Sequence, residues 1–311
     1  MKIITNKRFF KKIKKGLTVS SVITASTFLH GPPVLALGLT KLFKKSAKID
    51  QTNINITNSW LGVNNWLIDH VLANTEWNIE IDEQLDLNLQ GRYLMLCNHQ
   101  SWVDTTVNQY VGLTRMPLTR FFTKWELIFI PFVGPAFKIL GFPMMKRHSK
   151  SQIAKNPELK NRDIAEARKA CEQLLSQPFT LLNYVEGTRF TPEKHQQQKS
   201  PYQHLLKPKS GGLALALNIL GNQIDALVDM TIVYPDGVPD YANFWLGEVP
   251  RIAVHLRKIE IPKWVLQGNY ETDREYRVQF HQWLSGIWQE KDQIIQQIKM
   301  RYSPASTESL S

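Results

Sequence analysis

Six strand-like runs, separated by stretches with helical periodicity, constrain the fold of this chain most. The runs are short, apolar or alternating, and they span residues 77–81, 93–97, 142–145, 179–185, 227–234 and 252–259. Apolar residues recur at helical spacing in residues 161–175, 210–220 and 273–300. Strands that alternate with helices favour a sheet covered by helices. The sequence therefore predicts an α/β fold with a mixed, mainly parallel sheet, in which the polar stretch 193–204 is a loop.

The positive charge of the chain is concentrated at its N-terminus. The 311 residues include 38 lysines and arginines against 27 acidic residues. Eleven of the cations precede Asp50, the first acidic residue, so the remaining 27 cations balance the acidic residues. A nucleic-acid-binding domain would carry a basic patch on its folded part. The neutral body therefore argues against nucleic acid as a partner.

The basic N-terminus encloses an apolar stretch, residues 16–43, which predicts a membrane anchor. Lysines near an anionic lipid surface contribute about 1 kcal/mol each. The favoured interpretation is a pair of short apolar helices that bend at Gly31, Pro32 and Pro33 and dip into one leaflet. A single membrane span, which needs roughly 20 residues, and a cleaved signal peptide are the alternatives.

These patterns divide the chain into three parts. We expect residues 1–48 to form the basic, helical membrane anchor, residues 49–303 the α/β domain, and residues 304–311 a disordered tail. The two cysteines, Cys97 and Cys171, have the spacing of neither a disulfide framework nor a zinc site. We therefore expect a reducing compartment and no metal site.

The segment "CNHQSWVDTT", residues 97–106, contains the first candidate chemistry. If a strand ends at Cys97 and a helix begins at Ser101, Asp104 becomes the third helical residue, within reach of the His99 ring. The carboxylate would then fix the tautomer of His99 and support positive charge on its ring, as the orienting acid of a catalytic triad does. The structural alternative is an ordinary helix cap beside a turn histidine. Cys97 as a nucleophile is a third possibility.

Three further motifs place cations beside apolar elements. They are Glu186-Gly187-Thr188-Arg189 after the run 179–185, Lys146-Arg147 after the run 142–145, and Lys209 before a helix that opens with glycines. Each motif alone also fits a structural role, as a salt bridge, a solvated turn or a helix start. Ligands of α/β sheets, however, bind beyond the carboxyl ends of the strands, and arginine and helix starts suit phosphate. Together with His99, the motifs predict general-base catalysis on a phosphorylated substrate.

The order of these motifs resembles the glycerophospholipid acyltransferase family, above all the 1-acylglycerol-3-phosphate acyltransferases. The resemblance rests on H-x4-D, F-P-x-x-K-R, E-G-T-R and a following apolar strand, "LVDMTIVYPDG", and it covers residues 75–300. "EGTRFTPEKH" and "LLKPKSGG" look like a branch of bacterial and eukaryotic lysophospholipid acyltransferases. The chain departs from the common Phe-Pro before the glutamate, where it has Tyr184 and Val185.

The resemblance implies a reaction and a role for each motif. His99, oriented by Asp104, would deprotonate the free hydroxyl of a lysophospholipid, which attacks the thioester of acyl-CoA or acyl carrier protein. The acceptor would be lysophosphatidic acid and the product phosphatidic acid. Glu186 would contact the glycerol or position Arg189. The residues implied in phosphate binding are Arg189, Glu186, Gly187, Thr188, Arg147, Lys146 and Lys209.

The resemblance further implies an enzyme of phospholipid biosynthesis that needs no cofactor beyond its acyl-donor substrate. Its place would be a membrane, the inner membrane of a bacterium, with the catalytic domain on the cytoplasmic side. Lysophosphatidylglycerol and lysophosphatidylinositol are alternative acceptors, and a non-catalytic basic membrane-binding protein is the alternative from another class. The apolar segment 125–140 either belongs to the core or lines an acyl-chain tunnel.

Overall fold

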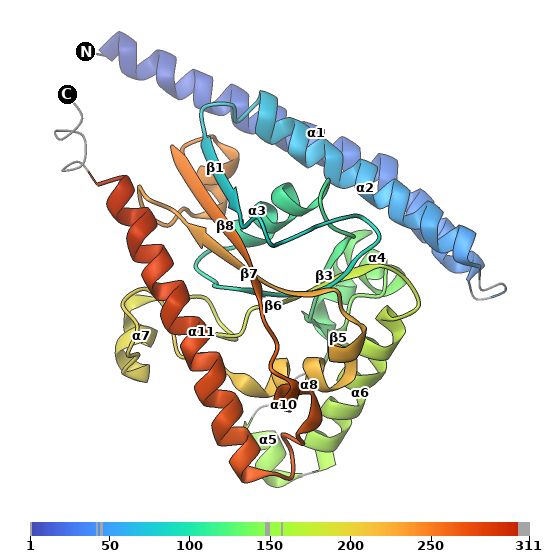
Figure 1. Ribbon diagram of the computed structural model, residues 1–311. Coiled ribbons are helices and arrows are strands. Elements are labelled where there is room, and N and C mark those ends of the chain that lie inside the picture. The colour runs from blue at the N-terminus through green and yellow to red at the C-terminus, as the bar shows by residue number, and fades with distance from the viewer. Residues whose placement is uncertain (1, 42, 44–45, 147–149, 157, 304–311) are drawn as a thin grey trace.

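The computed structural model describes residues 2–41, 43, 46–146, 150–156 and 158–303. The main strands are β1 (Glu76–Ile81), β2 (Arg92–Cys97), β3 (Thr119–Phe121), β6 (Phe179–Asn183), β7 (Ala226–Val233) and β8 (Arg251–Ile259). They form one sheet in the order β1-β8-β7-β2-β6-β3 (Figure 1). Strands β2, β3, β6 and β7 run parallel, β1 is parallel to β8, and β7 is antiparallel to β8. The predicted mixed, mainly parallel sheet is confirmed.

One predicted strand lies outside this sheet. Of residues 142–145, Met144–Met145 form β5, which pairs in parallel with β4 (Thr123–Lys124) in a separate two-stranded sheet. Pro143 has no N–H to give to a ladder, and its carbonyl accepts a hydrogen bond from Thr123 N at 2.8 Å. The edge of the main sheet is taken instead by β3, whose three residues are too few to leave a pattern in the sequence.

Helices cover both faces of the sheet. They are α1 (Lys2–Thr40), α2 (Ala47–His70), α3 (Val103–Gly112), α4 (Val133–Ile139), α5 (Lys150–Lys155), α6 (Glu158–Leu174), α7 (Pro192–Gln198), α8 (Ser210–Leu220), α9 (Tyr241–Trp245), α10 (Lys263–Gln267) and α11 (Arg274–Arg301), with 3₁₀ turns η1 (Trp125–Phe129) and η2 (Gly221–Gln223). The three helices predicted from periodicity form as α6, α8 and α11. The predicted loop 193–204 is wrong in its first half, which belongs to α7. Pro192 occupies the first helical position there, and the Thr191 side chain accepts a hydrogen bond from Lys194 N.

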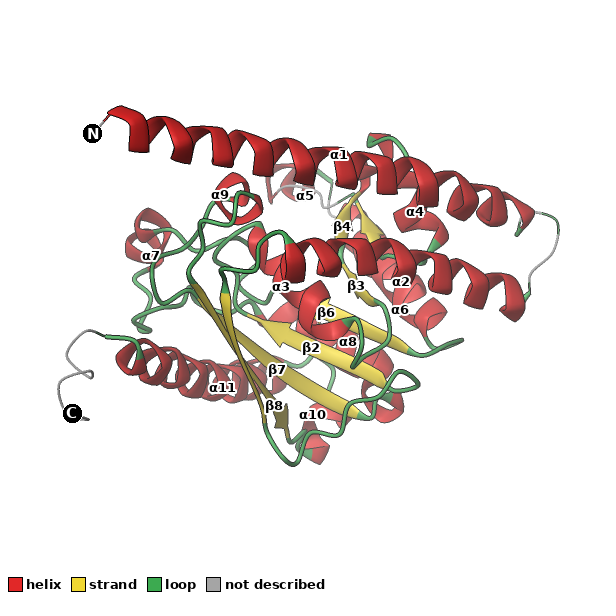
Figure 2. Cartoon of the chain, turned by 90° about the horizontal axis from the view of Figure 1, so that it is seen from above, coloured by secondary structure: helices red, strands yellow, loops and turns green. Residues whose placement is uncertain are grey.

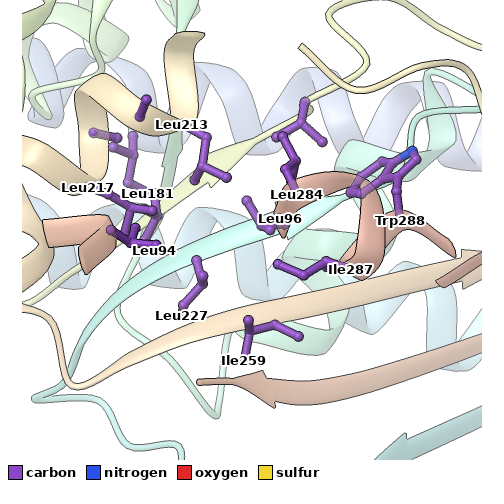
Figure 3. Packing of buried hydrophobic residues seen from close by; sticks show 14 of the residues in the cluster. Leu94, Leu96, Leu181, Leu213, Leu217, Leu227, Ile259, Leu284, Ile287 and Trp288 are labelled. Atoms are coloured by element: carbon purple, nitrogen blue, oxygen red, sulfur yellow. The ribbon is translucent and has the colours of Figure 1, made fainter. Parts of the chain in front are cut away.

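Strand β2 contributes to a core on each side of the sheet. Leu94 and Leu96 pack in one cluster with residues of α8 and α11, whereas Tyr93, Met95 and Cys97 pack with α3. Figure 3 shows the first cluster, in which side chains from the sheet meet leucines of α8 and α11. All residues of β7 are buried, as expected for a strand covered on both faces.

The predicted bend at Gly31, Pro32 and Pro33 is wrong, because α1 runs without a break from Lys2 to Thr40. Proline in a helix interior removes a donor and ordinarily kinks the helix. Here the segment 132–139 packs against α1 on both sides of the prolines. A Cβ on Gly31 would lie 3.0 Å from Cβ of Phe132, and a side chain on Gly38 would collide with Ile139. This close packing supports the helix through its two prolines.

Helices α1 and α2 lie side by side along the domain (Figures 1 and 2). His30 joins them, since its Nε2 lies 3.1 Å from Ser59 Oγ. Residue 49, the predicted start of the folded domain, therefore lies inside a helix that packs on the predicted anchor. The predicted tail, 304–311, lies outside the described residues.

Helix α1 has a packed side and an apolar exposed side. The segment Phe9–Thr40 is long and apolar enough to cross a membrane, by length and composition alone. On the packed side Val19, Ser26, His30 and Val34 are buried. The large apolar residues exposed on α1, here called its outer face, are Phe9, Phe10, Ile13, Leu17, Phe28, Leu29 and Leu39.

A buried ion pair fixes α11 to the sheet. Lys291 of α11 is fully buried, and its Nζ lies 2.7 Å from Asp229 Oδ1 and donates to the carbonyl of Met230 at 2.6 Å. The other carboxylate oxygen of Asp229 accepts from Arg257 Nε at 3.0 Å. Removal of one partner from a buried pair leaves an uncompensated charge in the core.

We predict that Lys291→Met lowers the free energy of unfolding by about 3–5 kcal/mol, the usual cost of breaking a buried ion pair. Urea unfolding of the purified protein measures this change. The control is Lys258→Met, because Lys258 makes an exposed pair with Glu260 at 3.5 Å and such pairs contribute about 1 kcal/mol or less. Equal losses in the two variants would contradict the prediction.

Candidate active site

The turn after β2 is fixed to β7 by Asn98. This buried side chain donates from Nδ2 to the carbonyl of Ile232 and accepts from Ile232 N at Oδ1, both at 2.9 Å. The amide thus continues the sheet ladder beyond Cys97 and holds the next residue, His99, at the carboxyl end of the strand. This role of Asn98 was not predicted from the sequence, although a polar residue between an apolar strand and a candidate histidine is a usable signal.

His99 and Asp104 meet as the sequence predicts, with Nδ1 of the ring 2.8 Å from Oδ2 of the carboxylate. The side chain of Asp104 is 1% exposed and that of His99 14%. Because an ionised carboxylate only accepts hydrogen bonds, Nδ1 carries the ring proton and Nε2 keeps a free lone pair. The pair therefore has the geometry of a general base with its orienting acid.

The carboxylate of Asp104 also closes the turn that holds the histidine. Its Oδ2 accepts from Gln100 N at 2.6 Å and from Ser101 N at 2.9 Å. Helix α3 begins at Val103 with Trp102 in the N-cap position, one residue later than expected for an N-cap at Ser101, which makes Asp104 its second residue. Ser101 Oγ still accepts from Val103 N at 3.1 Å. One arrangement therefore contains both the hydrogen bonds at the helix start and the His99–Asp104 contact that the catalytic interpretation requires.

Tyr234, the residue after β7, completes the surroundings of Asp104. Its hydroxyl donates to Asp104 Oδ1 at 2.6 Å. Burial, together with the nearby carboxylate, raises the pKa of Tyr234 well above its usual value, so the phenol stays a donor. Tyr234 was not predicted from the sequence, because it is 130 positions away from its partner.

Glu186 joins the turn of His99 to the loop before α8. The side chain is fully buried, and its two carboxylate oxygens accept from His99 N and from Leu206 N, each at 3.1 Å. Burial raises the pKa of Glu186 to about 8, although the two N–H groups favour the charged form. The main chain adds a further link, from Phe190 N to the carbonyl of His99 at 2.7 Å. These contacts, rather than one with Arg189, occupy the carboxylate.

Arg189 lies beside the same turn. Its guanidinium carbon is 4.6 Å from the ring centre of Trp102, in a cation–π contact. Trp102 itself is 59% exposed. This contact places the half-buried Arg189 against the indole of Trp102, three residues after His99 in the chain. A guanidinium is a side chain that suits phosphate.

Two lysines lie close to the E-G-T-R loop. Gly187 has φ +68°, a conformation that favours glycine, and a Cβ there would lie 2.9 Å from Nζ of Lys209. Lys194, which the sequence analysis missed, donates from Nζ to Thr188 Oγ1 at 2.8 Å and to the carbonyl of Arg189 at 3.1 Å. Three cationic side chains thus surround Gly187 and Thr188.

The structure places the other predicted residues elsewhere, or they lie outside the residues that it describes. Lys146 is exposed after β5, in the small sheet, and Arg147 lies outside the described residues. Burial raises the pKa of the Cys97 thiol well above its ordinary value, which keeps it protonated and unsuited to nucleophilic attack. Within the described ranges, no three His, Cys, Asp or Glu side chains gather in a way that could hold a metal ion.

A cavity of about 360 Å³ lies behind α3, between the sheet and helices α1, α2 and α4. Most of its lining is apolar, and the segment 125–140 supplies Val133, Ala136, Phe137 and Leu140. Asn108, one helical turn after Asp104, also lines it. The cavity therefore extends from the neighbourhood of the His99–Asp104 pair toward the two N-terminal helices.

Comparison with known proteins places these features in a family. The family model described as Acyltransferase matches residues 78–235, slightly more than half of the chain. A 2-acyl-1-lysophosphatidylinositol acyltransferase of Saccharomyces cerevisiae is 24% identical over 67% of this chain and 62% of its own length. A probable 1-acyl-sn-glycerol-3-phosphate acyltransferase of Arabidopsis thaliana is 25% identical over 66% and 53%. Lysocardiolipin acyltransferase 1 of Gallus gallus is 24% identical over 65% and 52%. The chain thus spans less than two thirds of the length of these curated relatives.

A solved structure has a similar fold. The crystal structure of the 1-acyl-sn-glycerophosphate acyltransferase from Thermotoga maritima superposes with a TM-score of 0.53. The similarity covers 95% of this chain and 99% of that protein, at 14% sequence identity. At this identity the similarity shows a shared fold.

The raised pKa of Glu186 predicts a pH-dependent stability. The folded state keeps a proton up to about pH 8 that the unfolded chain releases near 4.5. The free energy of unfolding should therefore fall as pH rises from about 4.5 to about 8, and level off above that. In Glu186→Gln this part of the slope should disappear.

Urea unfolding at several pH values between 5 and 9 tests this prediction as the difference between wild type and Glu186→Gln. The matched control is Glu193→Gln, since Glu193 is exposed on α7 and its pKa is lowered. That variant should retain the wild-type slope over this range. A slope that is the same in Glu186→Gln and in the wild type would contradict the assignment.

Proposed function

This chain belongs to the glycerophospholipid acyltransferase family, and on that premise we propose that it transfers a fatty acyl chain to the free hydroxyl of a lysophospholipid. The acceptor is 1-acylglycerol-3-phosphate, the product is phosphatidic acid, and the donor is acyl-CoA or acyl carrier protein. The observation that carries the proposal is the His99–Asp104 contact of 2.8 Å through Nδ1, which leaves Nε2 for the substrate in this proposal.

The chemistry follows from this contact. Nε2 of His99 takes the proton of the acceptor hydroxyl as its oxygen attacks the thioester carbonyl. Asp104 stabilises the positive imidazole that results. When the tetrahedral intermediate collapses, the C–S bond breaks and the departing thiolate takes the proton from His99. A positioned general base of this kind contributes about 10²–10⁴ to the rate.

Cations around Gly187 bind the phosphate of the acceptor in this proposal. Arg189 offers a planar pair of donors, Lys209 Nζ lies close to Gly187, and Lys194 Nζ contacts Thr188. Glu186 does not contact the phosphate in this proposal. Its buried carboxylate instead holds this loop against the turn of His99. Lys146 and Arg147 remain candidates for the same role from the sequence alone.

The cavity behind α3 binds the acyl chain. Its lining is mainly apolar, and it starts near Asn108, one turn from the catalytic aspartate. An apolar chain gains about 0.8 kcal/mol for each CH₂ group that leaves water. Segment 133–140 then acts as a wall of the acyl-chain site as well as a packing surface for α1.

Residues 1–48 hold the enzyme at a membrane in this proposal, and residues 49–303 carry the chemistry. The outer face of α1 is apolar along its length, and Phe129 and Ile130 of the neighbouring segment are 79% and 44% exposed. The opposite side of α1 stays packed on the domain. The helix therefore lies along one leaflet, with Lys11 and Lys14 toward anionic headgroups, on the cytoplasmic side of a bacterial inner membrane.

A second acceptor class is supported by the relatives. Two of them are named for lysophosphatidylinositol and lysocardiolipin, whose phosphates are diesters with a further substituent. Gly187 is exposed and helix α7 has no buried residue, so in this proposal such a headgroup would extend over the loop and α7. The mechanism at His99 is the same for either acceptor.

Thiol release from an acyl-CoA, measured with purified protein and a panel of lysophospholipids, tests the function. We expect release that requires lysophosphatidic acid and is lost in His99→Ala by a factor of about 10²–10⁴, while binding to anionic vesicles persists. Release with another lysophospholipid alone would change the acceptor and keep the mechanism. If neither acyl-CoA nor acyl carrier protein supports transfer to any acceptor, the proposed function is wrong.

The contact between Trp102 and Arg189 predicts a graded effect on acceptor binding. Arg189→Ala should raise the KM for the acceptor more than tenfold, because a charge-assisted hydrogen bond is lost. Trp102→Ala should raise the KM for the acceptor about 2-fold to 5-fold, which corresponds to the loss of an exposed cation–π contact. Trp102→Phe should raise this KM less. Steady-state kinetics at varied acceptor concentration measures both.

A double variant shows whether Trp102 acts through Arg189. In the Arg189→Ala background, Trp102→Ala should have no further effect on KM. The control is Trp66→Ala, since Trp66 is a half-exposed tryptophan of α2 outside the proposed site. Additive effects of the two site substitutions would contradict the contact as the cause.

A further inference from the structure

The imidazole of His99 lies on the ring of Tyr184. The two ring centres are 4.1 Å apart, and their planes are inclined by 19°, so the contact is a stack. Tyr184 follows β6 directly and precedes the E-G-T-R loop. Its ring covers one face of the imidazole, whereas Asp104 contacts one edge of it.

A hydrogen bond fixes the tyrosine from the other side. Nδ2 of Asn108 donates to the Tyr184 hydroxyl at 3.3 Å and to the main-chain carbonyl of Asp104 at 2.8 Å. Burial raises the pKa of Tyr184 well above its usual value, so the hydroxyl stays neutral. Asn108 thus connects the end of β6 to the first turns of α3. His99, Asp104, Asn108 and Tyr184 form a closed ring of contacts.

One hydrogen bond to Asp104 does not fix the orientation of the histidine ring. The torsion that rotates the ring of a histidine, χ2, has broad, roughly two-fold minima rather than sharp wells. Rotation about this bond would swing Nε2 away from a bound hydroxyl. A flat ring at 4.1 Å prevents that rotation on one side. The edge contact and the face contact together define where Nε2 points.

We propose that Tyr184 is a positioning residue for His99, which holds the imidazole in the plane where Nδ1 meets Asp104 and Nε2 meets the acceptor hydroxyl. The part of this inference that concerns catalysis rests on the proposed acyltransferase function. The stack also favours the charged ring that forms during reaction, because the face of a tyrosine attracts a cation. Tyr184 touches no reacting atom, so its effect is exerted on kcat and not on the binding of either substrate.

Two substitutions separate the ring from the hydroxyl. Tyr184→Leu keeps an apolar side chain but removes the stack, and we expect kcat to fall by about 10-fold to 100-fold, as for other small misplacements of a catalytic group, with KM unchanged for donor and acceptor. Tyr184→Phe keeps the stack and should restore most of kcat, since the bond it loses to Asn108 is long. Equal loss of kcat in both variants would overturn the role of the stack.

A buried tyrosine outside the site controls for loss of packing. Tyr276 of α11 is 7% exposed and donates from its hydroxyl to the carbonyl of Val265 at 2.6 Å. Tyr276→Leu should lower the unfolding midpoint and leave kcat of the folded enzyme unchanged. If Tyr276→Leu lowers kcat as much as Tyr184→Leu does, the effect is one of general packing and the proposal fails.

A measurement without turnover keeps the test independent of the proposed function. The ring protons of His99 lie over the face of Tyr184, so the ring current should shift their NMR signals upfield. The signal is assigned by its loss in His99→Ala. The upfield shift should be lost in Tyr184→Leu and kept in Tyr184→Phe.

The two kinds of failure are then distinct. If wild type transfers no acyl chain but the upfield shift is present and depends on the ring of Tyr184, the proposed function fails and the stack is real. If wild type is active and the shift is absent, or if Tyr184→Leu loses the shift and keeps kcat, the positioning role is wrong while the acyltransferase stands.

Discussion

The carboxylate of Asp104 is the interaction on which the rest of the site depends. It is buried beneath the turn and accepts four hydrogen bonds, from the ring of His99, from Gln100 N and Ser101 N, and from the hydroxyl of Tyr234. Two of the donors shape the backbone of the turn, one comes from a distant strand end, and one is the ring that we propose as the general base. A buried charge without such donors would cost several kcal/mol. The same four contacts that make the charge tolerable also set the histidine in place.

The sheet supplies the distances that this arrangement needs. Neighbouring strands lie about 4.8 Å apart, and β7, β2 and β6 are adjacent and parallel. The residues that follow them therefore meet at one edge, which brings together Tyr234, His99 and Tyr184 from positions far apart in the chain. The antiparallel β8 and the short β3 lie on either side of this central trio. The order and direction of three strands are thus enough to bring the His99–Asp104 pair together with Tyr234 and Tyr184.

The sequence predicts those parts of the site that depend on local spacing. His99 and Asp104 are five residues apart across a strand end and a helix start, so their meeting follows from the chain geometry between them. Tyr234 is a different case. Its role depends on the adjacency of β7 and β2, which no local pattern encodes. Glu186 was found as a motif residue, but its place beneath the loop follows from burial, which only the packed structure defines.

The errors of prediction also have physical causes. Pro32 and Pro33 indicate a bend when α1 is considered alone, whereas packing against Phe132 and Ile139 keeps the helix continuous. The predicted loop 193–204 directly follows a helix start, Thr191-Pro192, that a closer reading of cap residues would have found. Strand β3, with three residues, depends on its partner β6 for its existence. Long-range contacts therefore decided the structure of α1 and β3. The start of α7, by contrast, follows from its local capping residues.

Helix α1 has a second role, because of its residues Ile23 and Thr27. These residues belong to the helix whose outer face is apolar, and they also line the cavity behind α3. The part of the molecule that would rest in lipid is therefore a wall of the internal chamber, and not a tether attached to it. In the proposed membrane arrangement, a change in the depth or tilt of this helix would move a wall of the chamber. The thickness and order of the bilayer would then be variables of the proposed reaction.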